Sequence, residues 1–157
     1  MASTTGISVL AIDPGLRTGW AMWSPGKFRA GICDPEDVWD LLDRWTNEWT
    51  PVPALGGGVR RRGCLVMESY TITGETARKS QQPWSLELIG CGRMLAGQRG
   101  QDFALQAPSA AKKFGTDYKL KLLDMYTPGR EDHARDASRH LLLHLVKAGL
   151  LDIGGVA

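Results

Sequence analysis

A nearly continuous apolar run, Ile7-Ser-Val-Leu-Ala-Ile12, constrains the fold of this chain more than any other feature. A short run that does not alternate between apolar and polar residues is typical of a strand buried on both faces. The run ends at Asp13-Pro14-Gly15, a sequence that favours a tight turn. The same turn places a carboxylate where a buried strand ends, which is an ordinary way to build a metal or phosphate site. Both interpretations of Asp13 stay open until partners for its carboxylate are found.

The 157 residues are expected to form one domain, residues 1–157, with a core between about residues 7 and 148. The hydrophobic fraction of 43% and the charged fraction of 23% are typical of a globular protein. Cys33, Cys64 and Cys91 lack metal-ligand spacing, and we interpret them as buried thiols in a reducing compartment. The first residues do not resemble a signal peptide, so we expect a cytoplasmic protein that does not associate with membranes.

Turn residues and the hydrophobic pattern together predict the order of strands and helices. Strands are expected at 7–13, 18–24, 27–33, 64–68 and 102–107, and helices at 35–49, 83–98, 116–126 and 132–147, with a brief helical turn after Pro108. Residues 51–63 and 70–82 are expected to be connections. Three hairpin-connected strands followed by alternating helices and strands predict an α/β fold with a mixed five-stranded sheet and helices on both faces.

Acidic side chains follow two of the expected strands. Asp13 ends the first strand and Glu68 ends the fourth. If these strands are adjacent and parallel, both carboxylates lie at the same edge of the sheet. His133 and Asp136 are three residues apart in the first turn of the last helix, so they share one face of that helix. A helix that closes over this edge brings all four side chains together.

Several carboxylates at one point repel each other unless a cation neutralises them. Carboxylate oxygens are the ligands that Mg²⁺ and Mn²⁺ prefer. Two such ions clamp the attacking and leaving oxygens when a phosphodiester is displaced. The four side chains therefore indicate a site for two Mg²⁺ or Mn²⁺ ions, with phosphodiester hydrolysis as its reaction.

The order of these motifs resembles the RuvC family of Holliday-junction resolvases, which belongs to the ribonuclease H-like superfamily. The resemblance rests on Ile7–Gly15, on Thr18-Gly19 at the start of the second strand, on Leu65–Glu68 and on His133-x-x-Asp136. It implies a ribonuclease H-like fold and a metal-dependent, structure-selective endodeoxyribonuclease that resolves four-way DNA junctions by paired cuts. It also implies a homodimer, because a two-fold junction requires two symmetric active sites. No small-molecule cofactor is implied.

By this resemblance Asp13, Glu68, His133 and Asp136 are the catalytic and metal-binding residues. Asp13 is expected to bridge two ions, Glu68 and Asp136 to hold one each, and His133 to complete the second site or to act on the water. Family members carry Asp or His at the position of His133, and an imidazole there favours Mn²⁺ slightly. Asp132 is a spare acid that either joins the site or caps the helix.

Six residues near these positions are predicted to contact DNA, namely Tyr70, Arg78, Lys79, Lys112, Lys113 and Lys119. The net charge of +2 does not by itself argue for a nucleic-acid partner, and each basic residue has the alternative of an ordinary solvated side chain. Together the basic residues suit a phosphate-binding face. Tyr70 has core packing as its alternative. The loop Gly74–Gln82 and the arginine-rich connection at 51–63 differ from bacterial resolvases, which favours a phage-type member in a bacterial or phage-infected cell.

Other functions compete with a junction resolvase. Actin-like kinases and ATPases place similar turns after a first strand, but they need a second duplicated domain, for which this chain has no room. A nuclease of the same fold that cuts flaps or forks remains an alternative, as does a non-catalytic nucleic-acid-binding member. His140 and His144 are four residues apart on the last helix, and they are either a zinc-binding pair or residues on the helix flank.

Overall fold

The computed structural model describes residues 6–52, 61–75, 78 and 82–155. The strands are β1 (Gly6–Asp13), β2 (Thr18–Ser24), β3 (Lys27–Cys33), β4 (Arg61–Glu68) and β5 (Asp102–Gln106). The helices are α1 (Pro35–Glu48), α2 (Gln82–Gln98), α3 (Pro108–Phe114), α4 (Asp117–Leu122) and α5 (His133–Lys147). The predicted order of strands and helices is confirmed.

The strands form one mixed sheet in the order β3-β2-β1-β4-β5. β1 pairs antiparallel with β2 and parallel with β4, so the apolar first strand lies at the centre. β3 extends the sheet as an antiparallel hairpin, and β5 runs parallel to β4. The parallel strands β1, β4 and β5 therefore end at one edge, which we call the carboxyl edge and define by their last residues, Asp13, Glu68 and Gln106.

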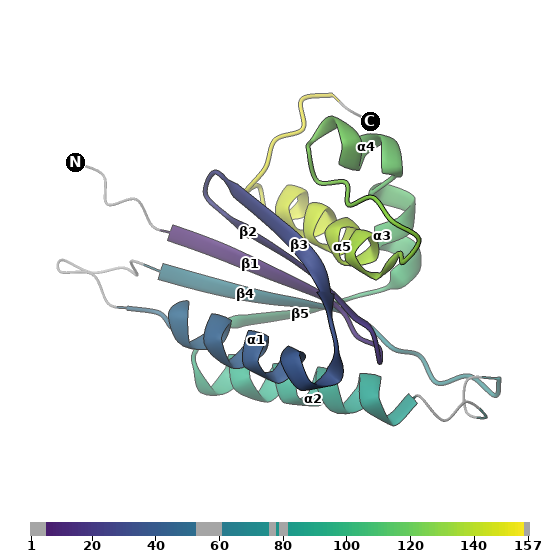
Figure 1. The fold of residues 1–157 in the computed structure, drawn as a ribbon. Helices are drawn as coiled ribbons and strands as arrows, with labels where there is room; N and C mark the ends of the chain where they lie inside the picture. The colour runs from purple at the N-terminus through teal and green to yellow at the C-terminus, as the bar shows by residue number, and fades with distance from the viewer. Residues whose placement is uncertain (1–5, 53–60, 76–77, 79–81, 156–157) are drawn as a thin grey trace.

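Helices α1 and α2 cover one face of the sheet (Figure 1). Alternate residues of β1, Leu10 and Ile12, point to this face and pack against α1 residues such as Trp45. Ser8 is the polar residue within the apolar run, and it is satisfied because its Oγ donates to the carbonyl of Trp23 and accepts from Trp45 Nε1. The predicted helical cover on this side is confirmed.

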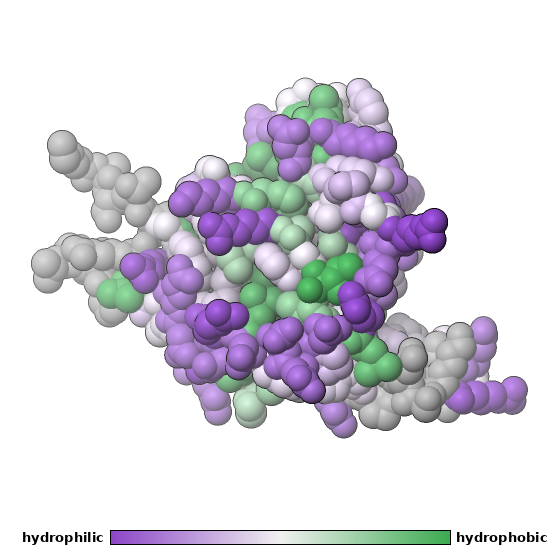
Figure 2. All heavy atoms as spheres, viewed as in Figure 1, coloured by the Kyte–Doolittle hydropathy of each residue, from purple (hydrophilic) through white to green (hydrophobic). Residues whose placement is uncertain are grey.

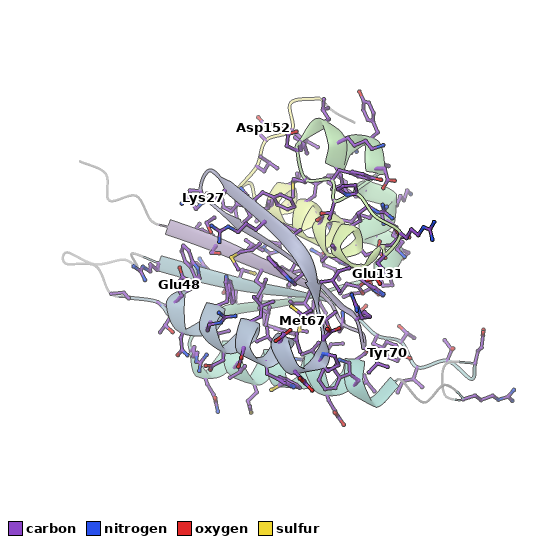
Figure 3. All side chains as sticks on the ribbon, viewed as in Figure 1. Lys27, Glu48, Met67, Tyr70, Glu131 and Asp152 are labelled. Atoms are coloured by element: carbon purple, nitrogen blue, oxygen red, sulfur yellow. The ribbon has the colours of Figure 1, made fainter. Side chains whose placement is uncertain are left out.

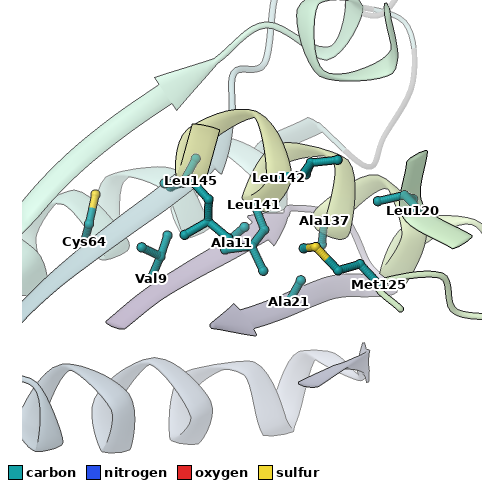
Figure 4. Packing of buried hydrophobic residues seen from close by; sticks show 11 residues of the cluster. Val9, Ala11, Ala21, Cys64, Leu120, Met125, Ala137, Leu141, Leu142 and Leu145 are labelled. Carbon is teal, nitrogen blue, oxygen red and sulfur yellow. The ribbon is translucent and has the colours of Figure 1, made fainter. Parts of the chain in front are cut away.

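Helix α5 covers the other face, together with α3 and α4 (Figure 1). Val9 and Ala11, the remaining alternate residues of β1, pack under Leu141 and Leu145 of α5 (Figure 4). The central strand is thus buried on both sides, which explains why its sequence does not alternate. The fold is a three-layer α/β arrangement, as predicted, and α5 packs over β2, β1 and β4.

Two element boundaries differ from the prediction by more than one residue. β4 begins at Arg61 and not at residue 64, because residues 61–63 pair with residues 6–8 of β1. The Arg62 guanidinium also pairs with Asp102 of β5 at 2.7 Å. α4 ends at Leu122, and the following chain turns through Asp124, whose φ is 54°. Hydrophilic side chains dominate the face seen in Figure 2, with small hydrophobic groups between them. Within the described chain, no helix has the length and apolar character needed to cross a membrane.

Candidate active site

Three side chains of the carboxyl edge point toward α5. Because side chains alternate along a strand, Asp13 lies on the same face as Ala11, which packs under α5. Glu68 likewise follows Val66 by two residues in β4, and it pairs directly with Gln106 of β5. Asp13, Glu68 and Gln106 therefore form a row across three adjacent parallel strands, with Glu68 in the middle.

Helix α5 faces this row with three polar side chains of its own, His133, Asp136 and His140. His133 Nδ1 lies 3.0 Å from Asp13 Oδ2, and His140 Nε2 lies 2.9 Å from Glu68 Oε2. His140 Nδ1 also lies 2.9 Å from Gln106 Oε1. The helix is thus joined to all three strands at the carboxyl edge, over sequence separations of 120, 72 and 34 residues.

Asp13 is buried, with 8% of its surface exposed. Burial raises the pKa of Asp13 to about 6; the negative charges of Glu68 and Asp136 also raise this pKa, whereas the hydrogen bond and charge of His133 lower it. The other three predicted ligands therefore each lie within electrostatic reach of Asp13. The carboxyl edge carries negative charge that its own side chains do not fully neutralise around Asp13.

Asp136 is neutralised by two cations from its own neighbourhood. Lys112 of α3 places its Nζ 3.1 Å from Asp136 Oδ2, and the Arg139 guanidinium contacts the other carboxylate oxygen. Arg139 also pairs with Asp117 of α4 at 2.5 Å and donates from Nε to the carbonyl of Gly115 at 3.1 Å. This network ties the two short helices to the site.

The Asp13-Pro14-Gly15 turn is held by the first turn of α2. Trp84 Nε1 donates to the carbonyl of Gly15 at 2.8 Å, and Ser85 Oγ donates to the carbonyl of Pro14 at 3.0 Å. Thr18 Oγ1 gives the Gly15 carbonyl a second donor at 2.7 Å. These bonds satisfy the carbonyl groups of Pro14 and Gly15, so the backbone next to Asp13 is held in place.

The loop before α5 is held close to the same turn. Arg17, just beyond the turn, pairs with Glu131 at 3.0 Å and with Asp34 at 3.3 Å. Figure 3 shows Glu131 and Tyr70 on the side of the molecule where β1 and β4 end. Gly19 of β2 lets the start of α5 pack closely against this strand, because a Cβ at Gly19 would overlap the backbone carbonyl of His133.

The residues predicted to contact DNA occupy different surroundings. Lys112 reaches the site through Asp136, and Lys113 is exposed beside it on α3. Lys119 on α4 lies over the ring of Phe114 at 4.6 Å. Tyr70 is half-buried against the core on the α1 and α2 side, so the packing alternative accounts for at least part of its ring. Arg78 is exposed, whereas Lys79 lies outside the described residues.

The carboxylate and imidazole groups at the edge are of the chemical type that binds Mg²⁺ or Mn²⁺. Among the described side chains, no three of His, Cys, Asp or Glu converge closely enough to hold one ion as they stand. Glu68 is turned to His140, and Asp136 to Lys112 and Arg139. The uncompensated charge around Asp13 nevertheless fits a divalent cation, which would favour its ionised form.

Asp132 and Arg135 flank His133 in sequence but face away from the other site residues. Asp132 occupies the position before α5, but its carboxylate pairs with Arg135 and makes no side-chain cap bond. Arg135 points away from the edge, toward the hydroxyl of Tyr126 and the carbonyl of Gly129. Asp132 is therefore engaged outside the group of four.

Sequence reasoning missed His140, Gln106 and Arg139. His140 was placed on the helix flank or in a zinc pair, but it is buried and contacts Glu68, while His144 lines a separate cavity beside Cys64. A signal was present, because His140 follows Asp136 by four residues and so shares its helix face. Gln106 ends β5 as Asp13 and Glu68 end their strands, but its neutral amide does not signal a metal site as a carboxylate does.

Comparison with solved structures gives matches over nearly the whole chain, among them two structures of Thermus thermophilus RuvC. The structure of Thermus thermophilus RuvC in complex with a Holliday junction substrate matches with a TM-score of 0.59 and 16% sequence identity, covering 92% of this chain and 96% of that one. A second Thermus thermophilus RuvC structure matches with a TM-score of 0.56 and 16% identity, covering 91% and 96%. No protein-family model and no curated protein matches the sequence. The chain therefore has the fold of RuvC, a ribonuclease H-like α/β fold, as its motifs predicted.

Proposed function

We propose that this protein is a divalent-metal-dependent endonuclease that resolves four-way DNA junctions. The observation that carries the proposal is that Asp13 contacts His133 and lies within electrostatic reach of Glu68 and Asp136 at the carboxyl edge, in the motif order of the RuvC family. The fold supports it, since the matching Thermus thermophilus protein was solved with a Holliday junction substrate. Residue by residue, Asp13, Glu68, His133 and Asp136 are the proposed ligands of two Mg²⁺ or Mn²⁺ ions.

Bound ions of this kind polarise a phosphate and make water a nucleophile at neutral pH. The chain's own residues prepare the site for that chemistry. His133 holds Asp13 through the 3.0 Å contact, and the bonds from Trp84 and Ser85 fix the turn beneath it. Lys112 has 56% of its side chain exposed, so it can leave Asp136 for a DNA phosphate. In the reaction water attacks phosphorus and one phosphorus–oxygen bond to the sugar breaks.

Paired cutting requires two such sites, and we propose a homodimer for this reason. Sedimentation of the purified protein alone and with a junction tests the stoichiometry directly. Two protein chains per junction are expected. A single chain bound per junction at saturating protein would contradict paired cutting while leaving a nuclease possible.

Cleavage of a synthetic four-way junction tests the function itself. The junction should be cut in Mg²⁺ or Mn²⁺, should be spared in EDTA, and should be preferred over fork, flap and plain duplex. Asp13→Asn should abolish cutting while junction binding persists, because it removes the central carboxylate and leaves the basic residues. Asp40→Asn is the matched control, since Asp40 is exposed on α1.

Each result has a defined meaning. Full activity of Asp13→Asn would contradict the assignment of the site. Preferred cutting of flaps or forks would favour the second nuclease class of the same fold. Junction binding by the wild-type protein without cutting under any ion condition would favour the non-catalytic alternative.

A further inference from the structure

His140 is a buried histidine that none of the proposed catalytic roles uses. Only 1% of its side chain is exposed, and it lies in the middle of α5. Its Nε2 lies 2.9 Å from Glu68 Oε2, and its Nδ1 lies 2.9 Å from Gln106 Oε1. Both ring nitrogens are therefore engaged with side chains of the carboxyl edge.

The arrangement repeats the contact between His133 and Asp13 two turns further along α5. In each case an imidazole from one face of the helix meets a carboxylate at the end of a parallel strand. The two histidines differ in exposure, since 44% of the His133 side chain is exposed and 1% of that of His140. His133 is thus accessible to a ligand, whereas His140 can act only through the side chains that it touches.

Glu68 needs such a contact more than Asp13 does. A glutamate carboxylate is separated from its backbone by three rotatable bonds, and 21% of the Glu68 side chain is exposed. The contact with His140 uses Oε2, and the same carboxylate has a second oxygen, Oε1. Gln106 engages the opposite nitrogen of the ring through its side-chain amide, which offers both an acceptor oxygen and a donor NH2 group, so the imidazole is held in an orientation in which Nε2 faces Glu68.

We propose that His140 is a positioning residue that donates from Nε2 to Glu68 Oε2, with its ring held by Gln106, so that Glu68 Oε1 is presented to a divalent cation. The inference rests on the proposed function, in which Glu68 is a metal ligand. Hydrogen-bond partners of ligands commonly set the orientation and basicity of the ligand, and their loss weakens metal binding about 10- to 100-fold.

A purely structural role makes a different prediction. A buried histidine needs hydrogen-bond partners in any fold, so replacing it lowers stability whatever Glu68 does. Cation affinity separates the two roles, because it can be measured without DNA and without turnover. His140→Leu removes the donor, whereas His140→Gln offers an amide N–H in place of Nε2–H.

The experiment is calorimetric titration of Mn²⁺ into the DNA-free protein, with thermal melting of each variant in EDTA. His140→Leu should weaken Mn²⁺ binding about 10- to 100-fold, and His140→Gln should restore most of the affinity. His144→Leu is the matched control, because His144 lies one turn further on the same helix and lines the cavity beside Cys64 and Ala148. Wild-type Mn²⁺ affinity in a folded His140→Leu protein would overturn the proposal.

Nuclear magnetic resonance of the wild-type protein avoids any dependence on a variant that fails to fold. With ¹⁵N-labelled histidine, the His140 ring should carry a proton on Nε2, and that signal should move when Mg²⁺ is added. An Nε2 without a proton, or a signal that does not move when Mg²⁺ is added, would overturn the proposal.

The two proposals fail in different ways. If the wild-type protein cuts junctions and His140→Leu keeps its Mn²⁺ affinity, only the positioning role is wrong. If the wild-type protein neither binds Mn²⁺ nor cuts any branched DNA, the proposed function is wrong and the positioning role is lost with it.

Discussion

Asp13 combines burial with the negative charges of two neighbouring carboxylates, and its pKa is raised to about 6 for that reason. The usual pKa of an aspartate is 3.8, so the folded state penalises ionised Asp13 and the unfolded state does not. The stabilising contribution of the protonated group is complete below pH 4 and is lost as the pH rises through 6. The site is therefore expected to cost stability at neutral pH when no cation is bound.

Asp13→Asn should accordingly stabilise the metal-free protein. At pH 8 in EDTA the free energy of unfolding should rise by up to about 3 kcal/mol, the equivalent of the raised pKa, and at pH 4 the difference should nearly vanish. Urea unfolding at the two pH values measures it. Equal stabilisation at both values would show that the effect does not come from ionisation.

Asp136→Asn is the contrasting variant. Asp136 is paired with Lys112 and Arg139, so removing its charge takes an ionic partner from each of these cations, although Arg139 keeps its pair with Asp117. The free energy of unfolding of Asp136→Asn should fall by about 1–3 kcal/mol at pH 8, whereas that of Asp13→Asn should rise at the same pH. The two substitutions should therefore change stability in opposite directions, because the two carboxylates have different surroundings.

At the scale of elements, the contact between β2 and α5 sets the distance between the start of α5 and the sheet. Gly19 makes this contact possible, because a Cβ would overlap the His133 carbonyl group. Gly19→Ala should therefore push the start of α5 away from the sheet. We expect a loss of about 1–3 kcal/mol in stability and a loss of Mn²⁺ affinity.

Gly90→Ala is the matched control for that substitution. Gly90 lies in α2, where an added methyl group would meet open space, and alanine is the better helix former. Calorimetric melting and Mn²⁺ titration of both variants compare them. Gly90→Ala should gain about 0.5–1 kcal/mol in stability and keep its cation affinity. Unchanged cation affinity in Gly19→Ala would show that α5 tolerates the displacement.

The site could be predicted from the sequence where a local pattern marks it. Asp13 and Glu68 end apolar strands, and His133 and Asp136 share one helix face, so strand ends and helix periodicity were sufficient to place them near one edge of the sheet, whereas their role as metal ligands stays a prediction. The pairing of Lys112 with Asp136 was not predictable, because it depends on how α3 packs against α5. The start of β4 was misplaced for a similar reason, since residues 61–63 belong to the strand through their pairing with residues 6–8 of β1, which are distant in sequence.

At the scale of the whole molecule, the basic residues of α3 lie on the α5 side of the sheet, and Lys112 reaches the carboxyl edge through Asp136. The net charge of the chain is only +2, so attraction to DNA must come from where the charges lie. Lys113 is exposed on α3 beside Lys112, which touches the site. Lys27 begins β3 at the opposite end of the sheet, next to the residues paired with the start of β1 (Figure 3).

The salt dependence of junction binding should come in part from Lys113 and not from Lys27. Lys113→Ala should reduce the slope of log affinity against log salt concentration by about 1, which is the loss of one phosphate contact. Lys27→Ala should leave the slope unchanged. Fluorescence anisotropy with a labelled junction, in the non-cutting Asp13→Asn background, measures both. An equal change in the two variants would indicate nonspecific attraction over the whole surface.

The order of strands and helices along the chain determines when during folding the side chains of α5 reach the carboxyl edge. β1 and β4 carry their acids early in the chain, whereas the helix that faces them follows every strand of the sheet. Contacts over 120 and 72 residues form late in folding, because long chain loops must close first. During synthesis the candidate site should therefore remain incomplete until α5 has emerged from the ribosome and docked.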